Sequence, residues 1–343
     1  TTKRGKAGKL NINFKTNTSY AHSPRMPKYA DAYNYASLAN EARVVRGNDP
    51  LYTETELELY RLGLDPDLYP NVNWRDVILK DGVWNTQHHL GLSGGGENAR
   101  YYVSMGVLNN EAVFKQDKTS PYNSNVNYHK YNFRTNVDAN ITRSTLLSVN
   151  METVFVTQNS PGYGDNNDAL WSAQANLPPN LVPVRFSNGQ LPSFGKNADQ
   201  ISPYVQLNYT GYRAFERYSL KTNVLLRQDL SKLVQGLTVQ GLFSLATNGS
   251  HTIIHDLHPD LYFADPKIGR NMDGSIRLER RIEKKDLTSE QHSQADRLYY
   301  FEVQSNYDKI FNYDHRVTGL LHFYRQESKN SDWGWGIFDV VPR

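Results

Sequence analysis

The chain has no cysteine among its 343 residues, which excludes disulfide bonds and metal sites built on thiolates. It also has no apolar run near the ~18–20 residues of a membrane-spanning helix, so a helical membrane protein is excluded. A net charge of only +3 gives no reason to expect a nucleic-acid partner. A transmembrane β-barrel stays open, because alternating strands give such a protein a low mean hydropathy, here −0.67.

The unusual feature of the composition is the 23 tyrosines, which accompany abundant asparagine. Both residue types suit strands whose ends lie at a membrane interface, and both also suit carbohydrate-binding surfaces. The composition therefore favours a β-rich protein that meets either lipid or sugar.

The segment Trp84–Asn110 has the clearest pattern in the sequence. Alternate positions from Trp84 to Leu92, and again from Tyr101 to Val107, form two mostly apolar faces. A period of two residues predicts strands. The glycines at 94–96 supply the backbone freedom of a tight hairpin turn.

The same alternation recurs along the chain and predicts nine strands in all. The other seven stretches are 9–20, 131–140, 147–155, 217–229, 237–245, 299–303 and 317–323. In each of them one face is apolar and the other carries charged or amide groups. We therefore expect the polar face to be in contact with water.

The connections between these strands alternate strictly in length. The long ones span about 21–83, 110–127, 158–215 and 250–296, and the short ones 94–98, 140–144, 230–236 and 308–313. Outer-membrane barrels have this asymmetry, with tight periplasmic turns and long external loops. Aromatic residues near the long-loop ends of the apolar face fit an interfacial girdle; they are Tyr20, Trp84, Phe155, Tyr218 and Tyr299.

We therefore predict an all-β fold, namely part of a large antiparallel transmembrane β-barrel with long extracellular loops. Unpaired strand edges in lipid are very costly, so we expect the barrel to continue beyond Arg343. The first long loop is predicted to contain short helices. Asp31 caps one that runs to about Val44, and Thr53 and Glu56 have the spacing of a capping box for another, which ends at Gly63.

Four segments carry a resemblance to a known family. They are TTKRGKAGK (1–9), YNYASLANEA (33–42), DPDLYPNVNWRDVILK (65–80) and HHLGLSGGGENARYYVSMGVLNNEAVFK (88–115). In order and spacing they resemble the SusC/RagA-type TonB-dependent outer-membrane transporters of Bacteroidetes. The motifs cover the first third of the chain, and the strand pattern covers the rest.

The resemblance implies a barrel of about 22 strands, of which residues 9–343 would be the N-terminal portion. Residues 1–8 would be the linker from a plug domain. By the same resemblance the full protein would sit in the bacterial outer membrane and depend on TonB. It would import oligosaccharides, and less often peptides, beneath a SusD-type lipoprotein lid, with no cofactor and no enzymatic step.

Aromatic loop residues are the candidates for substrate contact, because flat rings stack on sugar faces. They are Tyr163, Trp171, Tyr204 and Tyr262; packing within the loops explains them equally well. Polar residues on the inward faces of the strands would line the lumen. They are Asn132, Arg134, Asn136, Asp138, Asn150, Glu152, Lys221 and Asn223.

Other motifs favour ordinary loop structure. His251, His255 and His258 are expected in a solvated loop rather than at a metal site. Gly164–Asp168 lacks the ligand spacing of a calcium loop. The mixed charges of Arg277–Lys285 predict a solvated segment.

Two other classes of protein compete with a transporter: an enzyme and a surface glycan-binding protein. Asp165 and Asp168 lie too close in the sequence to define a glycosidase geometry, so we do not expect an enzyme. The alternative that stays open is a β-rich surface protein that binds glycans and transports nothing.

Overall fold

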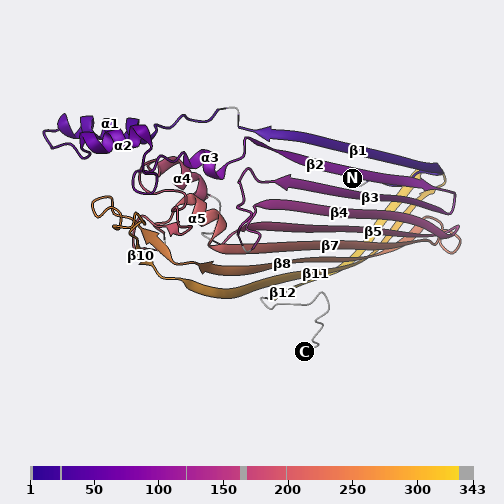
Figure 1. The fold of residues 1–343 in the computed structure, drawn as a ribbon. Helices are drawn as coiled ribbons and strands as arrows, with labels where there is room; N and C mark the ends of the chain where they lie inside the picture. Colours follow the sequence, from indigo (N-terminus) through magenta and orange to yellow (C-terminus); the bar gives the residue numbers. More distant parts are fainter. Residues whose placement is uncertain (1–2, 24, 121, 163–167, 198, 332–343) are drawn as a thin grey trace.

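The computed structural model describes residues 3–23, 25–120, 122–162, 168–197 and 199–331. Within them, nine strands form one antiparallel sheet in which neighbours in space are also consecutive in the strand order. The sheet curves, so that its last strands lie behind the first ones in Figure 1. The strands are β1 (Gly8–His22), β2 (Gly82–Gly95), β3 (Ala99–Glu111), β4 (Asn127–Thr142), β5 (Thr145–Pro161), β7 (Gly211–Asp229), β8 (Leu237–His258), β11 (Lys285–Phe311) and β12 (His315–Ser331). The predicted partial β-barrel is confirmed.

The register keeps each predicted face continuous across the sheet. One row pairs Ile12 with Leu92, Leu92 with Val103, and Val103 with Thr135. A slip of one residue would invert every side chain of a strand. Register shifts in this sheet occur only near strand ends, at Gly8/Asn11, Asn140/Thr142 and Lys285/Thr288. Between them the apolar residues stay on one face and the amide and charged residues on the other.

The apolar face of the sheet is uncovered in the described part of the chain. Ile12, Phe14 and Leu321 are 62%, 63% and 76% exposed. Aromatic pairs lie at its long-loop end, where the rings of Tyr20 and Trp84 are 5.1 Å apart. Exposed apolar area of this extent marks an interaction surface.

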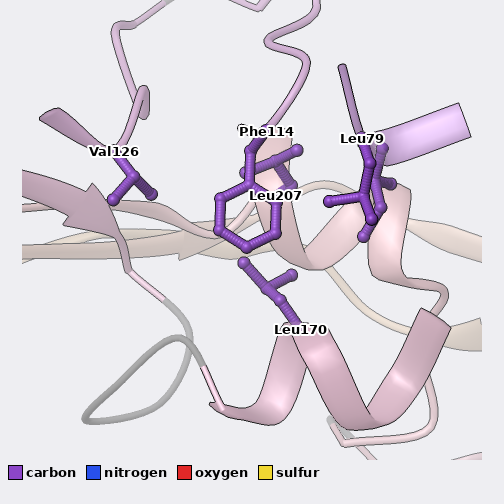
Figure 2. Packing of buried hydrophobic residues seen from close by; sticks show 6 residues of the cluster. Leu79, Phe114, Val126, Leu170 and Leu207 are labelled. Carbon is purple, nitrogen blue, oxygen red and sulfur yellow. The ribbon is translucent and has the colours of Figure 1, made fainter. Parts of the chain in front are cut away.

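Buried hydrophobic clusters lie instead in the long connections, at one end of the sheet. Figure 2 shows one of them, in which Phe114 packs with Leu79, Leu170 and Leu207. The other clusters are built around Leu191, Ala36, Leu68 and Trp74, all outside the nine strands. The connections therefore form a compact cap with its own core.

Short helices build much of this cap. α1 (Ala32–Val44) begins at Asp31 and α2 (Glu54–Leu62) has the Thr53–Glu56 capping box and a left-handed Gly63, which confirms the predicted helices. α3 (Trp74–Ile78), α4 (Asp168–Asn176) and α5 (Pro203–Asn208) follow, with a small sheet of β6 (Leu191–Pro192), β9 (Leu261–Phe263) and β10 (Glu279–Ile282). No helix among the described residues is long and apolar enough to cross a membrane.

Two predicted loop boundaries were wrong. Strand β8 runs on to His258 and β11 starts at Lys285, so the connection predicted at 250–296 is much shorter. His251, His255 and His258 therefore lie on a strand and not in a loop. Beyond residue 250 neither face is consistently apolar, so the alternation that reveals a strand is lost although backbone pairing continues.

Two further segments differ from expectation. Arg277–Lys285 is not wholly solvated, because β10 passes through it and buries Ile282 in a hydrophobic cluster. The loop predicted at 158–215 is shortened at both ends by β5 and β7. The Gly164–Asp168 motif falls almost wholly outside the described residues.

Gly211, at the start of β7, is required by its backbone and by its surroundings. Its φ is +90°, and an added Cβ would lie 1.9 Å from the carbonyl oxygen of His255. Replacement by alanine should lower the free energy of unfolding because of both the left-handed backbone and the clash. The clash alone should contribute at least ~2 kcal/mol. Hydrogen exchange of the amides that join β7 to β8 would measure the loss.

Gly269→Ala is the matched control, since Gly269 has φ +72° and no atom within 4 Å of its added Cβ. This variant should cost only about 1 kcal/mol for the left-handed conformation. Equal effects of the two variants would contradict the close packing at Gly211.

Candidate functional site

The polar face of the sheet carries a ladder of charged and amide side chains. Arg134 on β4 forms an ion pair of 2.8 Å with Glu152 on β5, and Lys221 on β7 is opposite Glu152. In the next row Asn136, Asn150 and Asn223 lie side by side. All eight residues predicted to line a lumen share this face, although their contact with a solute stays a prediction.

The N-terminal segment lies against this same polar face. The Asn136 side-chain amide donates to the carbonyl oxygen of Lys3 over 2.5 Å. The Arg4 guanidinium donates to Asp138 over 2.6 Å, and the Ser148 hydroxyl donates to the same carboxylate oxygen over 2.6 Å. Lys3 and Arg4 are therefore held on the polar face of the sheet by hydrogen bonds and an ion pair.

Asp117 is the centre of a polar cluster that joins separate connections of the cap. Its carboxylate accepts hydrogen bonds from the hydroxyls of Tyr204 and Tyr209, and from Thr119. The Arg185 guanidinium lies 3.4 Å from the same carboxylate and donates to Tyr209 over 2.5 Å. Partial burial alone would raise the pKa of Asp117, but the hydroxyl donors outweigh it and hold the pKa below its usual range.

A second ion-pair cluster ties the first and last long connections together. Arg270 contacts Asp65 over 2.6 Å and Asp67 over 2.9 Å. Asp67 also accepts from the amide and the hydroxyl of Ser187. The hydrogen bond from Arg270 is the main reason that the pKa of Asp65 is lowered. Both carboxylates belong to the 65–80 motif, which therefore helps to hold the cap together.

A groove of about 390 Å³ opens in the cap between α1, the 71–74 segment and α4. Its lining combines the partly exposed rings of Tyr29 and Tyr35 with the side-chain amides of Asn71, Asn73 and Gln174. Rings beside amides are what a ligand with flat apolar faces and many hydroxyls requires.

Gln174 makes the groove chemically specific. Its side chain is almost fully buried, and its amide nitrogen donates to the carbonyl oxygen of Trp171 over 3.1 Å. Its side-chain oxygen Oε1 is buried and accepts no hydrogen bond from the residues that the structure describes. A buried acceptor without a donor is costly, so a ligand hydroxyl or amide there would gain a good hydrogen bond.

The structure places the predicted aromatic residues in different surroundings. Trp171, on α4, is 39% exposed and its ring lies 5.7 Å from that of Phe114. The Tyr204 hydroxyl donates to Asp117, and Tyr262 packs against the Leu68 cluster. Tyr163 lies outside the described residues. A role of any of the four in substrate contact stays a prediction.

Sequence reasoning missed the residues of the groove. Tyr29, Tyr35, Asn71 and Gln174 come from three segments that lie far apart in the chain. Aromatic and amide residues in long loops are a usable signal, but only the folded cap brings these particular ones together. Among the described residues, no three potential metal ligands of the His, Cys, Asp or Glu type cluster together.

Comparison with known proteins gives two curated relatives, and no family model matches the chain. TonB-dependent receptor P26 of Formosa agariphila is 25% identical over 151 residues, which are 43% of this chain and 13% of that receptor. TonB-dependent receptor SusC of Bacteroides thetaiotaomicron is 24% identical over 196 residues, 55% of this chain and 17% of that protein. The matched stretches thus span less than a fifth of either relative.

Solved structures with a similar fold include two of the RagAB system. The RagAB peptide transporter matches with a TM-score of 0.65 over 96% of this chain and 36% of its own, at 14% identity. The open-open state of the RagAB peptide importer matches with a TM-score of 0.61, over 96% of this chain and 37% of its own, at 15% identity.

The fold is that of part of the β-barrel in the similar solved structures. Together with the two curated TonB-dependent receptors, it supports a likeness to a part of the SusC/RagA-type transporters. The resemblance found in the sequence motifs is confirmed.

Asp117→Asn should loosen the cap, because the charge that holds Arg185, Tyr204 and Tyr209 is lost. We expect a local cost of about 1–3 kcal/mol, measured as faster hydrogen exchange in the 185–209 segment. Since the pKa of Asp117 is lowered by folding, its contribution is complete above pH ~4 and is lost as the pH falls below that value. The protection should therefore weaken in acid.

Asp273→Asn is the control for this prediction. Asp273 accepts hydrogen bonds from Ser275, two positions on, as Asp117 does from Thr119. Among the described residues it bonds no tyrosine or arginine. If the two variants loosened the cap equally, the cluster around Asp117 would not be what holds it.

Proposed function

We propose that this chain forms part of the wall and external cap of a TonB-dependent importer of oligosaccharides in the bacterial outer membrane. The cap captures the substrate beneath a SusD-like lipoprotein. The substrate then enters the lumen along the polar face of the sheet. Passage follows when TonB pulls on a plug domain, so the free energy comes from the inner membrane and no bond of the substrate is broken.

One observation carries the proposal: the sheet is a single layer with one uncovered apolar face and one amide-rich face. A soluble sandwich would bury the apolar face against a second layer. Here the described residues place their buried clusters in the cap and leave Ile12, Phe14 and Leu321 uncovered. Lipid on one side and water on the other account for this distribution.

The asymmetry of the connections supports the same proposal. The helices, the small sheet and the hydrophobic clusters gather at one end of the strands, while tight turns close the other (Figure 1). Strands of 13–27 residues exceed the ~9–11 that cross a bilayer. The surplus length would raise the cap above the membrane surface, where a lid protein can reach it.

The groove between α1 and α4 favours an oligosaccharide as the substrate. Tyr29 and Tyr35 offer rings for the flat faces of sugar units, and Gln174 offers an acceptor for a hydroxyl. Peptides are the second candidate, because the similar RagAB structures are described as peptide transporters and importers. Calorimetry of the full complex against glycan and peptide panels would distinguish the two.

The groove makes a direct prediction about capture. Tyr29→Ala combined with Tyr35→Ala should weaken oligosaccharide binding about tenfold or more, since each ring contact contributes ~0.5–1.5 kcal/mol. Binding would be measured by titration calorimetry on the full-length protein with its lid partner. Trp171→Ala tests the neighbouring ring on α4 in the same assay.

Tyr313→Ala serves as the control, because Tyr313 is 99% exposed and lies in the turn between β11 and β12 at the opposite end of the strands. It should bind as the unchanged protein does. Full affinity in the Tyr29 and Tyr35 double variant would remove the groove from the proposal.

The lipid contact of the apolar face can be tested by charge. Phe133→Arg or Leu220→Arg should destabilise the bilayer-inserted protein by ~2–4 kcal/mol if the residue lies at the midplane. Equilibrium unfolding from lipid vesicles measures the cost. Leu62→Arg, which alters an exposed leucine on α2 in the cap, should change little. A small effect at both sheet positions would argue against membrane insertion.

A further inference from the structure

The aromatic residues predicted to form an interfacial girdle lie on an oblique line across the apolar face, called here the aromatic line; they are Tyr20, Trp84, Phe155, Tyr218 and Tyr299. Tyr218 shares its row of the register with Thr16 on β1 and Ala295 on β11. Tyr20 lies four residues beyond Thr16 toward the cap, whereas Tyr299 lies four residues beyond Ala295 toward the short turns. The aromatic line therefore descends eight residues between β1 and β11, which are seven strand spacings apart.

This slope is what tilted strands in a bilayer produce. Eight residues span about 26 Å of strand and seven spacings span about 34 Å of sheet, which corresponds to a tilt of about 40°. Strands of transmembrane barrels tilt by ~35–45°. The short turns descend in the same direction, since β2 ends seven residues below the row of Tyr218, at Gly95, and β11 ends sixteen residues below it, at Phe311. The aromatic line thus fits the outer boundary of the bilayer.

Cations lie at this boundary where the aromatic line reaches β11 and β12. On β12, Glu327 is opposite Tyr299 and Lys329 is opposite Arg297. The line continues between Glu327 and Arg325, so Arg297, Arg325 and Lys329 share the apolar face at the level where lipid headgroups begin. A further strand paired with the free edge of β12 would leave these side chains on the same face.

The three cations are a local concentration. No other arginine or lysine of the nine described strands lies on the apolar face within four residues of the aromatic line. The carboxylate that lies among them is Glu327, which contacts Arg325 over 3.7 Å and Lys329 over 3.1 Å. One carboxylate does not balance three cations, so the surface keeps a positive charge.

The register adds a second reason to expect an anion. Arg297 and Lys329 are directly opposite each other, and like charges in that position destabilise a sheet. The Lys329 ammonium lies 5.9 Å from the centre of the Tyr299 ring, so the pair is next to the aromatic line. An anion between the two cations would remove their repulsion.

We propose that the surface formed by Arg297, Arg325 and Lys329 binds a phosphorylated glycolipid of the outer leaflet. Cations at a membrane surface attract anionic headgroups, and arginine and lysine form charge-assisted hydrogen bonds with phosphate oxygens. Arg325 and Lys329 are about 13 Å apart along β12. A disaccharide headgroup with a phosphate at each end spans such a distance, whereas a single phosphodiester does not. This inference rests on the bilayer location in the proposed function.

Native mass spectrometry of the full-length transporter in uncharged detergent tests the proposal. The probes are bisphosphorylated lipid A, the same lipid without phosphates, and phosphatidylglycerol. Lipid A with both phosphates should bind, and the other two lipids should bind at least tenfold more weakly. Its affinity should fall as salt rises, since exposed charges are screened.

The decisive variant combines Arg297→Gln with Lys329→Gln. It should lose about tenfold or more in affinity for bisphosphorylated lipid A, because each cation near a membrane surface contributes a few-fold, and nothing for the lipid without phosphates. Glu327→Gln removes the competing carboxylate and should strengthen binding a few-fold. Lys309→Gln, which removes a cation from the same face of β11 near its short turn, is the control and should be unchanged. Lys329→Gln alone should lose a few-fold and serves if the double variant does not fold.

The outcomes separate this inference from the proposed function. Equal binding of the lipids with and without phosphates, or an unchanged affinity in both lysine variants, overturns the lipid site while the importer stands. Phosphatidylglycerol that binds as tightly as bisphosphorylated lipid A overturns the glycolipid assignment. A full-length protein that does not insert into bilayers overturns the importer proposal itself.

Discussion

The antiparallel register between neighbouring strands is the constraint on which the rest of the structure depends. It satisfies the backbone hydrogen bonds of nine long strands and keeps alternate side chains on fixed faces. With the faces fixed, Ile12, Leu92 and Val103 gather on one side, and Asn136, Asn150 and Glu152 on the other. The sheet therefore has one apolar and one polar face and no hydrophobic core of its own.

The cap, unlike the sheet, is stabilised by buried hydrophobic clusters. Its segments leave the wall and have no sheet to stabilise them, so they bury their own apolar residues and join through ion pairs. Phe114 and Leu207 pack at the base of the cap, Arg270 binds Asp65 and Asp67, and Asp117 holds Tyr204 and Tyr209. The cap thus holds its groove together by its own contacts, at one end of a sheet with one apolar and one polar face.

Local signals in the sequence predicted the local parts of this structure. The Asp31 cap, the Thr53–Glu56 capping box and the Trp84–Asn110 hairpin depend on near neighbours in the chain, and they were predicted correctly. The continuation of β8 through His251 and His255 was not, because pairing with β7 and β11 sustains that strand where no apolar alternation marks it.

The candidate sites were less accessible from the sequence. The groove joins residues near 29–35, 71–74 and 174–179, and the cationic surface joins β11 to β12. The groove depends on the folded cap. Arg297 and Lys329 lie outside the predicted strands at 299–303 and 317–323, so only the longer pairing of β11 with β12 places them opposite each other.

The most direct measurement of the central claim is site-directed labelling in a full-length protein from which any cysteine outside this chain has been removed; the chain itself contains none. Single cysteines at Val149 and Asn150, adjacent on β5, would be labelled with a fluorophore in the full-length protein reconstituted in lipid vesicles. The account predicts quenching at 149 by nitroxide-labelled lipid and at 150 by a water-soluble quencher. The reverse pattern, or equal quenching of both positions by the aqueous reagent, would contradict it.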